Sequence, residues 1–510
     1  MAAAGERLVK CCISLDSTNA FNTIDRGTML RALADTAPGL LPLARLMYNR
    51  AGRLVMPNKS WRPGEAAYKV FLSRCGARQG DPLGPVLFAL GMMTVMREVQ
   101  REHPEVHFPS FVDDIDALRV AKASEAGGEC DAVYTTLKNK LAAIGISFNS
   151  KTHLYCPSGD TIHTAHGITQ ARDGIATMGV PVGTAAFQLA RARKRLANSF
   201  AQLELLPQVH FGHAMRILRF CISKRVAFLA GSLTPDVFRP LAEEWDAAVR
   251  KCLTRMFAGA PPHPRCFLAG GGGLDITVIS EELSLLRVLS SSRALDCIRT
   301  FMPRLKQLTV PSSPSTHPVH IEIQAAWDSL PASVSGAAGV RHPLTPPAPR
   351  APPARNARTA SPPSTDSEAA VTERRALSAA MAAHRREALF LSMGELDRTL
   401  LEASHGKHGR AWADVTPTYA CYHMTSTQAR LAYCIWLGGE VAELRCCAEP
   451  RTLAVATACA ATPRAACYAT LRCATASATW RRRPVTTCGR RSLAFLVPSH
   501  RTCPLLCGAR

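Results

Sequence analysis

Two adjacent carboxylates, Asp113 and Asp114, follow an apolar run in residues 108–116 (FPSFVDDID). Successive side chains of a β-strand point to opposite faces, so both acids can enter one pocket only where the chain turns between them. We therefore expect a β-hairpin that turns at this pair. At an effective dielectric of about 20, two such charges about 4 Å apart repel by about 4 kcal/mol, so we also expect a cation beside them.

A third carboxylate, Asp16, ends another short apolar run at residues 11–16 (CCISLD). The chain then turns into a helical spacing of apolar residues at Met29, Leu30 and Leu33. Acids at the ends of two strands, together with magnesium, which prefers oxygen ligands, form the arrangement that two-metal phosphoryl transfer requires. For each acid taken alone, the alternative is a solvated turn residue.

A loop rich in Gly and Pro lies between these acids, at residues 73–85 (SRCGARQGDPLGP), and the apolar run after it predicts a buried helix. Taken in order, LDSTNAF, RQGDPL and FVDD resemble the palm of a reverse transcriptase. The short sequence NAFN is similar to the corresponding motif in the site-specific non-LTR retrotransposons of trypanosomatids. The resemblance implies an α+β fold whose palm is an antiparallel sheet with packed helices, and an RNA-directed DNA polymerase as the function.

The resemblance also implies roles for the residues that match these motifs. Asp16 and Asp113 would be the main ligands of two Mg²⁺ ions, for which Mn²⁺ could substitute, with Asp114 as a nearby third carboxylate. The residues expected at the nucleotide are Phe21 under its sugar, Arg78, Gln79 and Gly80 in the loop, and Lys151 beside the triphosphate. An RNA template, a DNA primer and deoxynucleoside triphosphates are the implied partners.

Three of these side chains also have plainer interpretations. Phe21 could be a core aromatic on the first helical turn, Arg78 a solvated loop charge, and Lys151 a surface lysine after a turn.

Composition limits the classes of partner. The 61 Lys and Arg residues exceed the 39 Asp and Glu residues, which gives a net charge of +22. This excess suits a polyanion and predicts salt-dependent binding, although charge alone does not separate nucleic acid from an anionic membrane. No run of about 18 apolar residues and no signal peptide are evident, so we expect an intracellular protein, nuclear by the resemblance. In that setting the 19 cysteines are expected as thiols or metal ligands rather than disulfides.

The chain divides into five parts by composition and spacing. Residues 1–185 match the palm, and its first catalytic strand begins so early that we expect an N-terminally truncated copy with the fingers largely missing. Residues 178–184 resemble the hairpin that grips the primer end. Residues 186–300 have helical spacing and would form a thumb. Its first helix carries a basic set, expected to hold the phosphates of the primer–template duplex or else to be a solvated face: Arg191, Arg193, Lys194 and Arg195.

The C-terminal parts differ in composition. Residues 301–372 are predicted to be a linker, because residues 342–363 hold eight prolines. Residues 373–440 return to helical spacing. Residues 441–510 hold eight Cys and eleven Arg but neither Lys nor Asp, and their cysteines lack the paired spacing of a zinc knuckle. We interpret this tail as the product of a frameshift near Leu444.

Two functions of different classes remain open from the sequence. The first is a working polymerase, and the second is an inactive element remnant that retains only nucleic-acid binding. Membrane binding is disfavoured, because the basic stripe at residues 191–195 lacks the Trp- and Phe-rich apolar face expected at a lipid interface.

Overall fold

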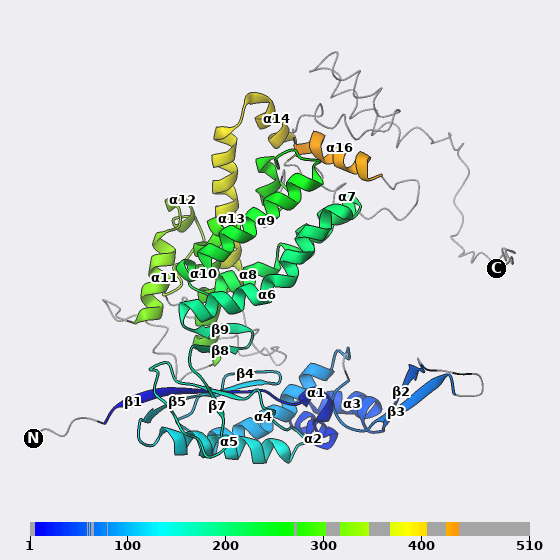
Figure 1. Cartoon of the computed structure of the whole chain (residues 1–510), viewed down its shortest axis with the longest axis vertical. Coiled ribbons are helices and arrows are strands. Elements are labelled where there is room, and N and C mark those ends of the chain that lie inside the picture. Colours follow the sequence, from blue (N-terminus) through cyan, green and yellow to red (C-terminus); the bar gives the residue numbers. More distant parts are fainter. Residues whose placement is uncertain are drawn as a thin grey trace, which may run out of the picture.

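A computed structural model describes residues 6–58, 60, 62, 66–78, 80–269, 273–301, 317–345, 368–404 and 425–437. Two units follow each other along the chain: a sheet unit, residues 6–183, and a helical unit, which begins at residue 185. Figure 1 shows the sheet unit at the bottom and the helices above it. The predicted mixture of an antiparallel sheet with packed helices, followed by helices, is confirmed at this level.

The main sheet of the sheet unit is centred on β1 (Leu8–Leu15). Its order is β4-β5-β1-β6-β7, in which β1 is antiparallel to both neighbours and only the edge pair β6·β7 is parallel. The other strands of this sheet are β4 (Ser110–Phe111), β5 (Asp114–Lys122), β6 (His153–Tyr155) and β7 (Thr169–Ala171). The central position of β1 fixes where the residue after it, Asp16, can lie.

One face of this sheet is covered by α2 (Arg26–Thr36), α4 (Gly84–Glu102) and α5 (Ala126–Ala142) (Figure 1). Alternate residues of β1 and β5 enter the core that these helices share, as the period of two requires. The face opposite therefore carries Ser14 and Asp116, which are partners across the two strands. The unit is completed by α1 (Ala20–Thr23), η1 (Pro38–Leu40), α3 (Leu41–Tyr48), and the two-stranded ribbon β2 (Gly52–Pro57) and β3 (Tyr68–Ser73).

A second hairpin, β8 (Gly174–Thr177) and β9 (Val180–Gly183), lies between the two units. Ile175 on β8 packs against Cys12 and Tyr155 of the main sheet. Val180 on β9 packs instead against the core of the helical unit. A hairpin is thus present at this place, but it begins at Gly174, because residues 178–184 hold only its turn and second strand; it contacts both units.

The helical unit has a core around the fully buried Trp245, which the aromatic ring of Phe200 meets edge-on. Leu196 and Leu203, from the segment with helical spacing, are buried in it. Its helices are α6 (Ala185–Leu205), η2 (Leu206–Gln208), α7 (Phe211–Ile217), η3 (Leu218–Ile222), α8 (Arg225–Ser232), α9 (Pro235–Met256), η4 (Pro264–Phe267) and α10 (Ile279–Phe301), and α16 (Ser426–Leu437) adds to the same core.

The linker predicted for residues 301–372 is wrong for residues 317–345. These residues form α11 (Pro318–Asp328) and α12 (Ala332–Ser335), and they pack with α10 and α13 (Glu368–Ser392), which α14 (Glu395–Ser404) follows. Burial of Ala326 and Val334 beside Leu285 stabilises this packing. The proline count dominated the sequence interpretation, but most of those prolines, and the tail 441–510, lie outside the described residues.

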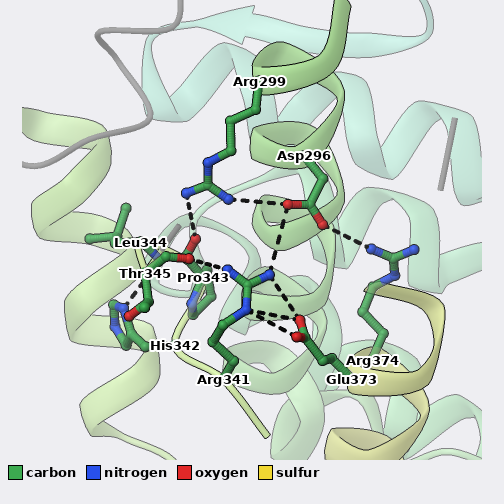
Figure 2. A network of polar contacts seen from close by, with 9 residues as sticks. All are labelled: Asp296, Arg299, Arg341, His342, Pro343, Leu344, Thr345, Glu373 and Arg374. Atoms are coloured by element: carbon green, nitrogen blue, oxygen red, sulfur yellow. Dashed lines mark hydrogen bonds and ion pairs between the residues drawn. The ribbon is translucent and has the colours of Figure 1, made fainter. Parts of the chain in front are cut away.

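Charged side chains hold the same region together. In Figure 2, Asp296 of α10 lies between Arg299, whose Nη1 is 3.1 Å from Oδ1, and Arg374 of α13, whose Nη1 is 3.5 Å from Oδ2. Arg341 donates to Glu373 of α13 at 2.8 Å. Arg341, which lies inside the predicted linker, is therefore joined to Glu373 of α13, and Arg374 of the same helix is joined to Asp296 of α10. Among the described residues, no helix is both long and apolar enough to span a membrane.

Candidate active site

The adjacent acids Asp113 and Asp114 lie at the turn of a hairpin. Strand β4 ends at Phe111, Val112 has a left-handed φ of 59°, and β5 begins at Asp114. The predicted hairpin at the Asp pair is therefore confirmed. Because Leu15 pairs with Ile115, Asp16 and Asp114 are the next residues along the two antiparallel strands and lie beside each other.

The three carboxylates interact electrostatically. Burial raises the pKa of Asp114, and the charges of Asp113 and Asp16 raise it further. Like charges brought this close favour a bound cation. The described residues contain no group of three or more His, Cys, Asp or Glu side chains that could by themselves hold a metal ion.

A fourth acid, Asp116, was missed by the sequence interpretation. It is only 4% exposed, lies on β5 opposite Ser14, and receives a hydrogen bond from that hydroxyl. Burial raises its pKa, and the charge of Asp114 adds to the effect. The sequence did hold a signal for this acid: Asp116 lies two residues after Asp114 in a strand, and that spacing places both side chains on one face.

Lys151 reaches the same place from a distant part of the chain. The backbone of residues 147–149 pairs with residues 16–18: Thr18 N donates to Ser147 O at 2.7 Å, and Asn149 N donates to Asp16 O at 3.0 Å. The Nζ atom of Lys151 consequently lies 3.9 Å from Oδ2 of Asp16. The lysine side chain is 78% exposed, so this ion pair adds little stability and leaves the ammonium accessible.

The loop at residues 73–85 is joined to the segment after Asp16. Gly76 N donates to Ile24 O, and Ala77 N donates to Phe21 O, both at 2.8 Å. The ring of Phe21 stacks on Phe88 of α4 with centroids 5.3 Å apart, and it remains only half-buried. The structure therefore places Phe21 beside the loop that carries Arg78 and an exposed Gly80, whereas Gln79 lies outside the described residues.

Arg26 supports this loop and was also missed. It is 6% exposed, and its guanidinium donates to Ser73 O and Ser73 Oγ at 2.8 Å and to Gly76 O at 3.0 Å. Burial lowers its pKa. No local signal distinguishes this arginine at the start of α2 from a solvated one, because its partners lie about 50 residues away.

The basic set on α6 does not form one free stripe. Arg193 forms an ion pair with Glu244 at 2.5 Å, and Arg195 donates to Gly179 O at 2.6 Å. The guanidinium of Arg191 lies over the Phe187 ring at 5.7 Å. These three residues and Lys194 are all exposed. Arg193 and Arg195 therefore also contact protein groups, and phosphate binding by the four basic residues stays a prediction.

Comparisons with known proteins agree with the motifs. Residues 2–182 match the family described as reverse transcriptase (RNA-dependent DNA polymerase). The chain is 31% identical over 150 residues to the retrotransposable element SLACS 132 kDa protein of Trypanosoma brucei gambiense. The aligned stretch covers 29% of this chain and 12% of that protein. The resemblance to a trypanosomatid non-LTR reverse transcriptase is thereby confirmed for this part of the chain.

Two solved structures also show a distant similarity. Telomerase of Candida tropicalis, in complex with a TWJ fragment of telomeric RNA, has 10% identity and a TM-score of 0.30, over 65% of this chain and 50% of that chain. Telomerase of Candida albicans with the same kind of fragment has 10% identity and a TM-score of 0.26, over 64% and 50%. TM-scores this low do not establish a common fold.

Proposed function

Because residues 2–182 match the reverse transcriptase family, we propose that this chain is an RNA-directed DNA polymerase of a non-LTR retrotransposon. The observation that carries the proposal is the meeting of Asp16 with the Asp113–Asp114 turn, next to the loop that follows Phe21. An RNA template, a DNA primer and deoxynucleoside triphosphates are its substrates. Nuclear localisation follows from the same likeness and is part of the proposal.

Divalent metal ions are general in this family, and the carboxylates of this site suit them. We assign two Mg²⁺ ions to Asp16 and Asp113, with Asp114 as the neighbouring carboxylate. Such ions, when bound, supply charge neutralisation on the triphosphate and acidify the attacking 3′-hydroxyl. Burial raises the pKa of Asp114, and the charges of Asp113 and Asp16 raise it further; a cation bound among these carboxylates would relieve that repulsion, which supports the assignment.

The remaining side chains position the nucleotide. Lys151, exposed beside Asp16, would protonate the leaving pyrophosphate or neutralise its negative charge. Phe21 would lie under the sugar and exclude a 2′-hydroxyl, because its ring is held against Phe88 and cannot withdraw. Arg78 and Gly80 would contact the nucleotide and template, with Gln79 between them.

The units then correspond to parts of a polymerase. Residues 1–185 would be the palm and residues 186–300 the thumb, with the β8–β9 hairpin at the primer end between them. On α6, Arg191 and Lys194 are the side chains proposed first for phosphate contact, because Arg193 already forms an ion pair with Glu244 and Arg195 a hydrogen bond with Gly179.

Primer extension tests the proposal. The full chain is mixed with an RNA template, an annealed DNA primer, Mg²⁺ and all four deoxynucleotides, and it is compared with Asp113→Ala. The control is Asp35→Asn, which removes an exposed carboxylate of α2 in the same unit. Extension by the parent chain and by the control, but not by Asp113→Ala, is the expected result.

The alternative function is separated in the same experiment. If no variant extends the primer while the full chain still binds the duplex in a salt-sensitive manner, the polymerase proposal is wrong and the chain is a nucleic-acid-binding remnant. Extension that survives Asp113→Ala would instead refute the assignment of that carboxylate.

A further inference from the structure

Tyr48, the last residue of α3, is buried next to the loop that carries Arg78. Its side chain is 2% exposed. Its hydroxyl donates a short hydrogen bond to Oδ2 of Asp81 and accepts one from Arg78 N at 3.1 Å. The second oxygen of Asp81 accepts from Leu83 N at 2.9 Å. One phenol therefore joins two residues of the loop, Arg78 and Asp81, to the rest of the sheet unit.

The ring of Tyr48 also holds the side chain of Arg78. The guanidinium carbon of Arg78 lies 5.5 Å from the ring centroid, a cation–π distance. On another side the guanidinium meets Gly52, where an added Cβ would be only 2.7 Å from Nη2 of Arg78. The arginine is thus confined between an aromatic ring and a backbone that leaves no room for a side chain.

The charge of Arg78 faces the Tyr48 ring but no carboxylate among the described residues. No ion pair joins it to a carboxylate among the described residues, although Asp81 is close in sequence. The hydrogen bonds of Asp81 go instead to Tyr48 and Leu83. Burial raises the pKa of Tyr48, so its hydroxyl stays protonated and remains the donor. A half-buried arginine that is held in place but lacks an anionic partner is suited to receive an anion from outside.

We propose that Tyr48 is a positioning residue, which holds Arg78 in the conformation that binds the triphosphate of the incoming nucleotide. This inference rests on the proposed function and adds to it a residue outside the recognised motifs. The physical reason is entropic. A free arginine loses its rotamer freedom when it binds phosphate, whereas one already held by a ring and a backbone loses less. The hydroxyl contributes by fixing the backbone of Arg78, and the ring contributes by fixing its side chain.

Equilibrium binding of dATP with Mg²⁺ to the full chain tests this inference without requiring catalysis. Tyr48→Phe keeps the buried ring and removes only the hydroxyl, so it is not expected to unfold the unit. Arg78→Ala removes the proposed ligand, and Tyr68→Phe on the exposed ribbon is the matched control, since Tyr68 is 60% exposed. We expect Tyr48→Phe and Arg78→Ala each to weaken binding about tenfold, the size typical of one hydrogen bond to a charged group.

The double variant distinguishes positioning from a general structural effect. If Tyr48 acts through Arg78, the double variant binds dATP no more weakly than Arg78→Ala alone. The inference would be overturned if the affinity losses of the two single variants multiplied in the double variant, or if Tyr48→Phe left the affinity unchanged. An equal loss in Tyr68→Phe, or no binding of dATP by the parent chain, would overturn it as well. In an active enzyme, KM for the nucleotide should rise while kcat is nearly unchanged.

The outcome for Tyr48 is separable from that of the proposed function. A parent chain that fails to extend primers, but whose dATP affinity falls in Tyr48→Phe and Arg78→Ala as described, would refute the polymerase and leave the positioning role standing. An active chain in which Tyr48→Phe changes neither KM nor affinity would do the reverse.

Discussion

Replacing Gly76 by alanine should break the junction between the loop and the segment after β1. Gly76 has φ of +75°, and a Cβ there would lie 2.3 Å from the carbonyl carbon and oxygen of Asn22 and 2.5 Å from its Cα. These are backbone atoms, which cannot rotate away. The loop would have to move outward, and the hydrogen bonds from Gly76 N to Ile24 O and from Ala77 N to Phe21 O would be lost.

The matched control is Gly80→Ala. Gly80 has a similar φ of +86°, but nothing lies within 4 Å of the Cβ position. Both variants therefore carry the cost of a left-handed alanine, about 1–2 kcal/mol. Gly76→Ala also loses two backbone hydrogen bonds, at about 1 kcal/mol each, so its total should be about 3–4 kcal/mol. The difference between the variants isolates the close approach of the two backbones.

Melting temperature and hydrogen exchange provide the assay. For a unit of this size about 1 kcal/mol corresponds to about 2–4 °C, so Gly76→Ala should melt roughly 4–8 °C below Gly80→Ala. The amides of Gly76 and Ala77 should also exchange faster in Gly76→Ala than in the control. Equal melting temperatures and equal exchange in the two variants would refute the argument that the loop is fixed by this contact.

Three further predictions concern the site and the helical unit. Phe21→Ala should raise incorporation of ribonucleotides relative to deoxynucleotides at least about tenfold in single-nucleotide extension, and an unchanged ratio would remove Phe21 from the sugar site. Arg195→Ala should weaken primer binding about tenfold and speed hydrogen exchange in the β8–β9 hairpin, because the hairpin loses its hydrogen bond at Gly179. Lys194→Ala should leave hydrogen exchange in that hairpin unchanged, and equal exchange in the two variants would contradict this. Burial lowers the pKa of His263, whose Nδ1 accepts a hydrogen bond from a backbone N–H of η4. The neutral imidazole therefore stabilises the folded chain above the ordinary histidine pKa of 6.5, and this stability is lost as pH falls through the lowered pKa. His263→Asn should accordingly lose less melting temperature than the parent chain between about pH 7.5 and about pH 5, and identical pH profiles would refute this.

Short-range features of the candidate active site follow from the sequence. The hairpin at Asp113 and Asp114 is encoded by an apolar run that meets two adjacent acids, and the end of β1 just before Asp16 is encoded in the same way. The turn at Gly179 is likewise local. In each case the physical determinants, which are side-chain alternation and turn conformation, act within a few residues of one another.

Other residues of the site could not be assigned from local pattern. The hydrogen bond from Arg195 to Gly179 O was not predicted, because that carbonyl lies 16 residues away in the sequence. Buried Arg26 and Tyr48 were not singled out, since an arginine or a tyrosine on a short helix has the same local pattern whether it is solvated or buried under a loop. The helices at residues 317–345 were mistaken for linker because neighbouring prolines outweighed a modest apolar pattern.

The sequence by itself therefore determined the acids, their strands, the loop and the family that these motifs indicate. Only the tertiary structure decided that Lys151 comes to lie 3.9 Å from Asp16, that Tyr48 supports Arg78, and that α11 and α12 pack on α10. The physical reason is the range of the interactions. Periodicity and turn preference are properties of adjacent residues, whereas burial and hydrogen bonding between residues 30 to 135 positions apart depend on how whole elements pack.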